Sequence, residues 1–273
     1  MFAGLRSVAG GQRSVPLEFE VGYIDPDDGE VRRLFADAFP VEFERVPPVR
    51  SFPSYKGQRN YPGLYWSASC GGHVGVESWL ERDEAMALDF DATVTRFAPQ
   101  PFWLFWPAGG RSRSHAPDFF ARRVDGTAVV IDCRPAQRIK PRDAEAFAAT
   151  EAACEQVGWE YRLVSGHDPV WLANLRWLAG YRHPRNFHPV VADRLLDAFA
   201  SPAAVMETAD RVGDPLAVLP VLYHLLWLQW LSVDLSVRLD AASVGTARPG
   251  WRVAAASRRR DDVRCRTVRR GGR

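Results

Sequence analysis

The stretch from Glu81 to Arg134 constrains the fold of this chain more than any other part. Within it, Asp125-Gly126 stands between two apolar-rich runs, HAPDFFARR and VVIDCRP. An Asp-Gly pair in that setting is a strong signal for a β-hairpin turn. We therefore expect two neighbouring strands, with Asp118 on the first and Asp132 on the second.

Three acids and one base accompany this hairpin. Glu81 lies in the helix-like run ESWLERDEAMALDFD, which precedes the hairpin. Arg134 follows Asp132 by two positions, and residues two apart on a strand point to the same face. Arg134 is therefore expected to project beside Asp132, toward a site that it shares with Asp118 and Glu81.

These residue types suit a metal-dependent site for phosphodiester hydrolysis. Mg²⁺ takes oxygen ligands and keeps several waters, so two or three convergent carboxylates can hold it and leave room for a substrate phosphate. A bound metal activates water and stabilises the charge that develops on the phosphate. We expect Glu81, Asp118 and Asp132 to be the ligands of Mg²⁺, with Mn²⁺ as an alternative.

The ordered series of motifs resembles the TnsA-like endonuclease subunits of heteromeric transposases. The resemblance covers roughly residues 72 to 181 and rests on ERDEAMALDFDATV, the pair Gln100-Pro101, PDF with a short Gly-containing turn, DCRP, and DAEAFAATEAACEQVGWEYRLV. It implies a restriction-endonuclease-like domain in which Glu81 is the helix acid and Asp118 the first strand acid. Asp132 and Arg134 match the second acid and the base position.

The main departure from the family pattern is Arg134, because Lys is commoner at that position. Arg cannot be deprotonated at ordinary pH, which excludes a general-base role. Its planar guanidinium can still clamp a phosphate through two hydrogen bonds. The cationic part of catalysis would then be electrostatic.

Other residues remain as alternatives near the same site. Glu77 and Glu81 are spaced by one helical turn and share a face, so either one could be the helix acid, and the family spacing favours Glu81. A charge run such as Glu77, Glu81, Asp83 and Glu84 is otherwise typical of a solvated helix face. Additional candidates are Gln100 and His115, of which the latter suits hydrogen bonding or phosphate contact more than metal ligation.

The resemblance implies a function and partners. The protein would nick double-stranded DNA at transposon ends, at the 5′ ends, during cut-and-paste transposition. Its partners would be a DDE-type transposase subunit and an AAA+ ATPase regulator. Two alternatives stay open: a catalytically weak scaffold subunit of the same complex, suggested by Arg134, and an autonomous nuclease of restriction or repair type.

Positive charge is concentrated although the formal net charge is only +2. The range from Arg111 to Arg142 holds eight Arg or Lys against three acids, and the range from Arg258 to Arg273 holds eight Arg. Clustered cations attract DNA phosphates. The expected DNA-binding residues are Arg111, Arg113, Arg122, Arg138 and Lys140. The alternative for the tail is a basic extension without a specific partner.

The chain is expected to be α/β, with a mixed sheet flanked by helices and then a small helical C-terminal domain. The predicted divisions are a β-containing lead-in and linker over residues 1–60, a nuclease domain over 61–182, a helical or winged-helix-like domain over 183–250, and a basic tail over 251–273. Helices are predicted for residues 76–88 and 142–157, and a strand for 160–164. Ser201-Pro202 and Asp214-Pro215 each combine an N-cap residue with a following Pro, which predicts two helix starts.

The helix after Asp214 is apolar on nearly all sides, which predicts a buried core helix and not a DNA-recognition helix. The following run LSVDLSVRLDAASV is expected to form a β-wing.

The four cysteines show no CxxC pairing, which argues against a structural zinc site and a disulfide framework. The stretch LAVLPVLYHLLWLQWL is interrupted by Pro220, His224 and Gln229, and the chain start shows no signal-peptide pattern, so we expect a cytoplasmic protein.

Overall fold

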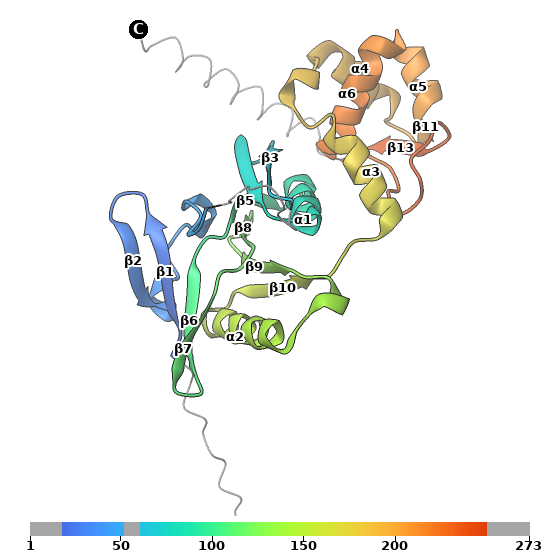
Figure 1. Cartoon of the computed structure of the whole chain (residues 1–273). Helices are drawn as coiled ribbons and strands as arrows, with labels where there is room; N and C mark the ends of the chain where they lie inside the picture. Colours follow the sequence, from blue (N-terminus) through green and yellow to red (C-terminus); the bar gives the residue numbers. More distant parts are fainter. Residues whose placement is uncertain (1–17, 52–60, 250–273) are drawn as a thin grey trace, which may run out of the picture.

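The computed structural model describes residues 18–51 and 61–249 (Figure 1). The basic tail expected at 251–273 and part of the predicted linker, 52–60, lie outside the described residues. The described chain is mixed α/β, with six α-helices and several separate sheets. Among these residues, no helix is both long enough and apolar enough to cross a membrane.

The sheet that organises the molecule has the strand order β10-β9-β8-β5. It contains β5 (Val94–Pro99), β8 (Phe119–Arg123), β9 (Ala128–Cys133) and β10 (Glu160–Val164). Strands β8 and β9 pair antiparallel around Gly126, whose φ of 87° suits glycine, and the predicted hairpin is confirmed. Strand β10 runs parallel to β9, so the chain must cross over between them.

That crossover is helix α2 (Pro141–Val157), which matches the predicted helix to within one residue at its start. Helices α1 (Trp79–Phe90) and α2 lie on opposite sides of the sheet (Figure 1). The predicted first helix begins three residues later than expected, because the hydroxyl of Ser78 caps it by accepting the N–H of Glu81.

A second four-stranded sheet has the order β2-β1-β6-β7. Its strands are β1 (Glu20–Asp25), β2 (Gly29–Leu34), β6 (Trp103–Ala108) and β7 (Arg111–His115). Two short 3₁₀ helices, η1 (Phe35–Ala38) and η2 (Phe43–Arg45), follow β2. Because β1 pairs with β6, the N-terminal hairpin is joined by backbone hydrogen bonds to the strand that leads toward the hairpin of Asp118.

Alternating side chains of β8 and β9 divide the interior into two cores. Phe120 and Val130 pack with Trp159 in the core that includes the N-terminal sheet and α2. Phe119 and Ile131 point the other way and pack in the core that includes α1 and the C-terminal helices. A strand buried on both faces reads as a continuous apolar run, which explains the composition of VVI before Asp132.

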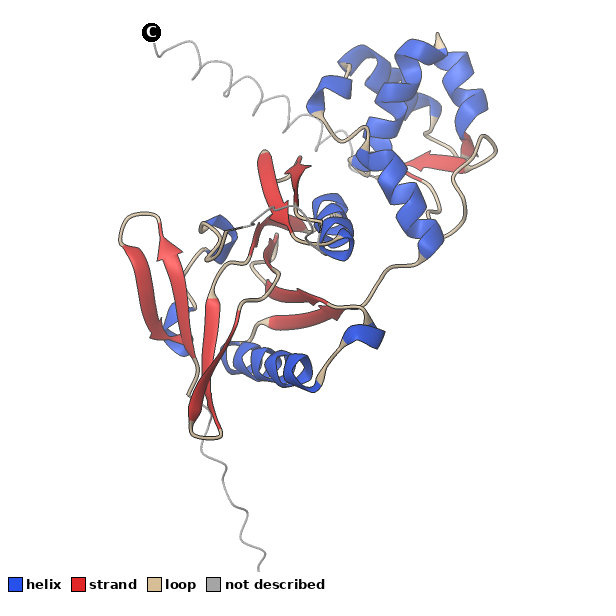
Figure 2. Ribbon diagram, in the orientation of Figure 1, coloured by secondary structure: helices blue, strands red, loops and turns tan. Residues whose placement is uncertain are grey.

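The C-terminal region gathers four helices (Figure 2). They are α3 (Pro169–Ala179), α4 (Pro189–Ala198), α5 (Val205–Val212) and α6 (Pro215–Trp227). A short 3₁₀ helix, η4 (Pro184–Asn186), joins α3 to α4. The predicted start at Asp214-Pro215 is confirmed, because the Asp214 side chain accepts the N–H of Leu216. Helix α6 is largely buried, as its apolar surface predicted.

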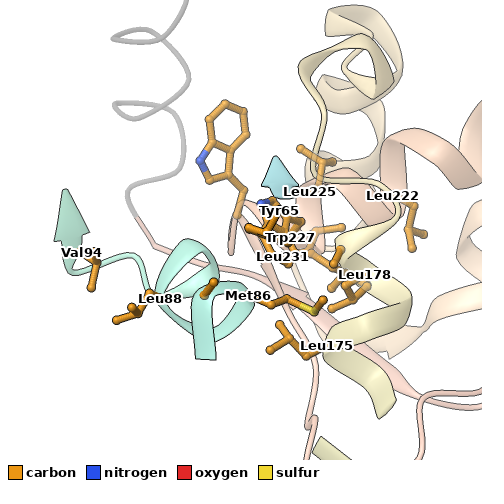
Figure 3. Packing of buried hydrophobic residues seen from close by; sticks show 14 of the residues in the cluster. Tyr65, Met86, Leu88, Val94, Leu175, Leu178, Leu222, Leu225, Trp227 and Leu231 are labelled. Atoms are coloured by element: carbon orange, nitrogen blue, oxygen red, sulfur yellow. The ribbon is translucent and has the colours of Figure 1, made fainter. Parts of the chain in front are cut away.

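The same core continues from the C-terminal helices to α1. Figure 3 shows Met86 of α1 close to Leu175 and Leu178 of α3, in one cluster with Leu222 and Trp227 of α6.

Two acids that follow Glu81 in α1 form ion pairs with neighbouring elements. Asp83 and Glu84 are buried and pair with Arg176 and Arg162, so the expectation of a solvated face is wrong for them.

The predicted helix start at Ser201-Pro202 is wrong. Residues Ala203–Ala204 form strand β11, which pairs with β13 (Val244–Ala247), and α5 begins only at Val205. Pairing across the small sheet takes the backbone groups that would otherwise have started the helix.

The expected β-wing is present only in part. The run LSVDLSVRLDAASV contributes β12 (Leu231–Ser232) and the first residue of β13, and the residues between these strands are irregular. The side chain of Asn174 fixes this irregular part, because its amide nitrogen donates to the carbonyls of Leu235 and Val237 and its oxygen accepts the N–H of Leu239.

A buried carboxylate attaches α1 to the hairpin of β3 (Gly63–Ser67) and β4 (Gly72–Val76). Asp89 accepts hydrogen bonds from the hydroxyls of Tyr65 and Ser67 at 2.9 and 2.8 Å. It also accepts the backbone N–H groups of Ala68 and Ser69 at 3.0 and 2.7 Å. These four bonds hold the turn of the hairpin against the helix that carries Glu81.

We predict that Asp89→Ala destabilises the protein by about 3 kcal/mol, because it leaves several buried donors without an acceptor. Asp91→Ala is the control, since the carboxylate of Asp91 accepts the N–H and the hydroxyl of Thr93 in an exposed turn, and loss of this carboxylate should cost about 1 kcal/mol. Urea unfolding followed by circular dichroism measures both. Equal decreases in the free energy of unfolding of the two variants would contradict the anchoring role of Asp89.

Candidate active site

A cleft of about 960 Å³ brings together all four residues that the motifs predicted. Glu81, Asp118, Asp132 and Arg134 line it. The sheet explains why the two aspartates meet there: Phe119 pairs with Ile131, so the next residue outward on each strand is Asp118 on one side and Asp132 on the other. The hairpin register thus places two carboxylates next to each other in the lining of the cleft.

Asp132 is 1% exposed and is held from two sides. The Nε2 atom of His115 lies 2.8 Å from its Oδ1 atom, and the hydroxyl of Tyr161 donates to its Oδ2 atom at 2.9 Å. Asp118 is half-buried, and its Oδ2 atom accepts the backbone N–H of Cys133 at 2.7 Å. These bonds orient both carboxylates, and they give His115 a positioning contact with Asp132.

Glu81 is fixed at the beginning of α1. Its carboxylate accepts the backbone N–H of Glu77 at 2.7 Å and the hydroxyl of Ser78 at 2.8 Å. The Ser-x-x-Glu spacing from Ser78 to Glu81 is the sequence signal of a helix capping box, and it could have indicated this local role. A capping role and a ligand role are compatible, because each carboxylate oxygen has two lone pairs.

Burial and repulsion make the ionised form of these acids costly. Burial raises the pKa of Asp118 well above its ordinary value, and the negative charges of Glu81 and Asp132 raise it further. Burial also raises the pKa of Glu81, although the hydrogen bonds from Glu77 and Ser78 act in the opposite direction. A group of acids with raised pKa values gains from a nearby positive charge.

The residues fit a hard divalent cation in their chemistry. They supply carboxylate oxygens, and a bound cation would relieve the repulsion that raises the pKa of Asp118. Within residues 18–51 and 61–249, no set of three or more His, Cys, Asp or Glu side chains has the arrangement of a metal site.

Arg134 lines the cleft beside the acids but is paired with another residue. Its Nε and Nη2 atoms donate to the same oxygen of Asp143 at 3.2 and 2.8 Å. Asp143 lies in the first turn of α2, and its carboxylate also accepts the N–H of Lys140. The guanidinium is therefore held at the start of α2, on the side of the cleft where Arg138 and Lys140 also lie.

Two arginines that line the cleft, Arg50 and Arg142, were not predicted. Arg50 lines it and binds Glu77, with its Nη2 atom 2.7 Å from the Oε2 atom of that carboxylate. The sequence VPPVRSFPS around Arg50 has no motif and no spacing that relates it to the acids. Glu77, the alternative helix acid, also lines the cleft, so both candidates are at the site and their ligand roles stay predictions.

The remaining predicted residues fall in different places. His115, Arg138 and Lys140 line the cleft, whereas Arg113 lies in a neighbouring hollow near Glu145. Arg111 is exposed at the start of β7. Arg122 contacts Glu44 and the carbonyls of Val41 and Gly126. Gln100 is buried, and its backbone N–H donates to the carbonyl of Asp118 at 2.9 Å.

Comparison with known proteins gives little further information. No protein-family model matches the chain. The chain is similar to the bifunctional enzyme IspD/IspF of Clavibacter michiganensis subsp. michiganensis, with 32% identity over 100 residues. That match covers 35% of this chain and 24% of the relative. A likeness limited to about a quarter of the relative's length assigns neither a family nor an activity.

We predict that Asp118→Asn stabilises the metal-free protein at neutral pH. A carboxyl whose folded pKa is raised binds more protons when folded, so its contribution to stability falls as pH rises from the unfolded pKa, about 3.9, through the folded value. The variant should therefore lose less stability than wild type between about pH 4 and pH 8. Thermal unfolding in EDTA across this range measures the difference.

Asp125→Asn is the matched control. Hydrogen bonding from Thr127 lowers the pKa of Asp125, so its charge stabilises the folded state above the unfolded pKa, and that contribution is lost as pH falls. Neutralising Asp125 should then destabilise the protein at neutral pH, the opposite sign to Asp118→Asn. If both variants lose stability at pH 7, the repulsion assigned to Asp118 is wrong.

Proposed function

We propose that this protein is a metal-dependent DNA endonuclease subunit of a heteromeric transposase, similar to TnsA, that nicks DNA at the 5′ ends of a transposon. The observation that carries the proposal is the convergence of Glu81, Asp118 and Asp132 in one cleft, with the two aspartates adjacent across β8 and β9. The raised pKa of Asp118 supports it, because such a group favours a bound cation.

The arrangement of the sheet also supports a restriction-endonuclease-like nuclease domain. An antiparallel hairpin, β8 and β9, carries the two aspartates, and a parallel strand, β10, follows after α2. Glu81 of helix α1 lines the same cleft, and α1 lies on the other side of the sheet from α2 (Figure 1). The acids thus come from three separate elements that the two cores hold in place.

The carboxylates would bind Mg²⁺ or Mn²⁺, and the bound cation would lower the pKa of a water and stabilise charge on the phosphate. Glu81, Asp118 and Asp132 would provide oxygen ligands. His115 and Tyr161 would keep Asp132 in one orientation. Water would add to phosphorus as a phosphodiester P–O bond breaks, and Arg134, which cannot give up its proton, would contribute only by charge.

The cations around the cleft suit DNA phosphates and do not suit sequence recognition. Arg138, Lys140 and Arg142 line it, and such side chains bind phosphates of any sequence. Helix α6 is buried and is not free to read bases. We therefore propose that a DDE-type transposase subunit supplies the choice of site and that an AAA+ ATPase regulates the complex.

A second candidate function is a catalytically weak scaffold of the same complex. The pairing of Arg134 with Asp143 favours it, because this guanidinium is already engaged at the position where the family commonly has Lys. An autonomous nuclease is a further outcome that the same experiment detects.

We predict that Asp118→Ala and Asp132→Ala abolish Mg²⁺-dependent nicking of transposon-end DNA when the partner proteins are present, because each removes an oxygen ligand and a negative charge. Asp125→Ala, in the exposed hairpin turn outside the cleft, should nick like wild type. Supercoiled plasmid carrying the element ends gives the readout.

Three outcomes separate the candidates. Normal nicking by folded Asp118→Ala protein would exclude the acid site. Absence of nicking by wild type with all partners, in either Mg²⁺ or Mn²⁺, would favour the scaffold. Sequence-specific cleavage by the isolated chain would point to an autonomous nuclease.

A further inference from the structure

Arg50 reaches the cleft from a part of the chain far from the acids. It follows η2 in the N-terminal region, and 26 residues separate it from Glu77, to which it binds. Its side chain is 40% exposed, so it remains accessible from the cleft that it lines. Any function of Arg50 at the site therefore depends on how the chain around it is held.

Two backbone hydrogen bonds connect this segment to Asp118. The N–H of Val49 donates to the carbonyl of Gln100 at 2.9 Å, and the N–H of Gln100 donates to the carbonyl of Asp118 at 2.9 Å. Gln100 has a φ of 44°, an unusual value for a residue other than glycine. Such a conformation is strained and persists where the surrounding structure fixes it. Gln100 thus links the residue before Arg50 directly to the acid of β8.

Hydrogen bonds connect Arg50 to one of the proposed ligands. Its guanidinium binds Glu77, whose own N–H donates to the carboxylate of Glu81. Arg50 also lines the same cleft as Glu81 and Asp118. The described hydrogen bond to Glu77 uses one of the five N–H donors of the guanidinium.

A structural role alone explains this arrangement poorly. An ion pair between two partly exposed side chains contributes little to the stability of the fold. The strained backbone at Gln100 and the two linked hydrogen bonds instead fix the position of Arg50 relative to Asp118. Guanidinium groups bind phosphate oxygens through two parallel hydrogen bonds, so a group in this position suits a phosphodiester.

We propose that Arg50 forms a phosphate-binding position of the cleft, next to Glu81 and Asp118, which takes a non-bridging oxygen of the DNA backbone. Glu77 holds the guanidinium in place and competes with the phosphate for it. Arg134 lies with Asp143 at the start of α2, and Arg138 and Arg142 also line the cleft beyond β9, so Arg50 is the cleft arginine that comes from the N-terminal region. This inference rests on the proposed action on DNA.

The test is DNA binding without cleavage. Fluorescence anisotropy of a labelled duplex, in EDTA and again in Ca²⁺, is measured over a range of salt concentrations with the full chain. Arg50→Gln should weaken binding about tenfold and reduce the slope of log K against log salt by about one, because one phosphate contact is lost. Glu77→Gln should tighten binding, because it frees the guanidinium.

A matched pair of controls removes the effect of net charge. Arg45 and Glu42 form an exposed ion pair at 3.0 Å in the same region, and neither residue lines the cleft. Arg45→Gln and Glu42→Gln therefore change the charge by the same amounts away from the site. Circular dichroism and thermal unfolding of each variant confirm that it is folded.

The proposal is supported if Arg50→Gln weakens DNA binding and Glu77→Gln tightens it, and if each change in affinity is larger than that of its control variant. Equal losses of DNA affinity in these two variants would overturn the proposal, since they would show that the ion pair only maintains local structure. An effect of Arg50→Gln no larger than that of Arg45→Gln would also overturn it. These binding measurements do not depend on nicking. If the wild-type protein fails to nick DNA but the two variants change DNA affinity in opposite directions, the proposed endonuclease function is wrong and the phosphate-binding role of Arg50 is still supported.

Discussion

The pairing register of β8 and β9 is the constraint on which the rest of the site depends. It sets Phe119 opposite Ile131, so Asp118 and Asp132 become neighbours at the end of the hairpin. A shift of one residue would turn every side chain of a strand to the other face. Because both faces of this sheet are buried in separate cores, such a shift would be costly, and the acids are held together by apolar packing.

The same site is electrostatically unfavourable without a cation. Burial and the neighbouring acids raise the pKa of Asp118, while the protein compensates only in part through the N–H of Cys133 and the charge of Arg50. Active sites commonly keep such uncompensated charge, because the energy is recovered when a ligand binds. The anchoring of α1 by Asp89 and by the ion pairs of Asp83 and Glu84 provides stability elsewhere in the same helix.

Sequence reasoning succeeded where local chemistry determines structure. Asp125-Gly126 specifies its turn without help from the rest of the chain, and Asp214 caps α6 by a bond to Leu216. It failed where a distant strand competes. Ser201-Pro202 has the chemistry of a helix start, but pairing of Ala203 with Gly245 takes precedence. The adjacency of Asp118 and Asp132 followed from the predicted hairpin, whereas the place of Arg50 could not be predicted, because only the tertiary fold relates it to Glu77.

The N-terminal region therefore belongs to the architecture of the site. Strand β1 pairs with β6, and Phe35, Phe43 and Trp159 pack together beneath the central sheet. This packing fixes the chain that leads to Val49, whose N–H donates to the carbonyl of Gln100. Arg50, the next residue, therefore lines the same cleft as the acids. The segment around Arg50 contains no recognisable motif, and it takes a defined position through its contacts with the rest of the fold. Two linked backbone hydrogen bonds, from Val49 to Gln100 and from Gln100 to Asp118, consequently fix the backbone next to Arg50 relative to the backbone of Asp118.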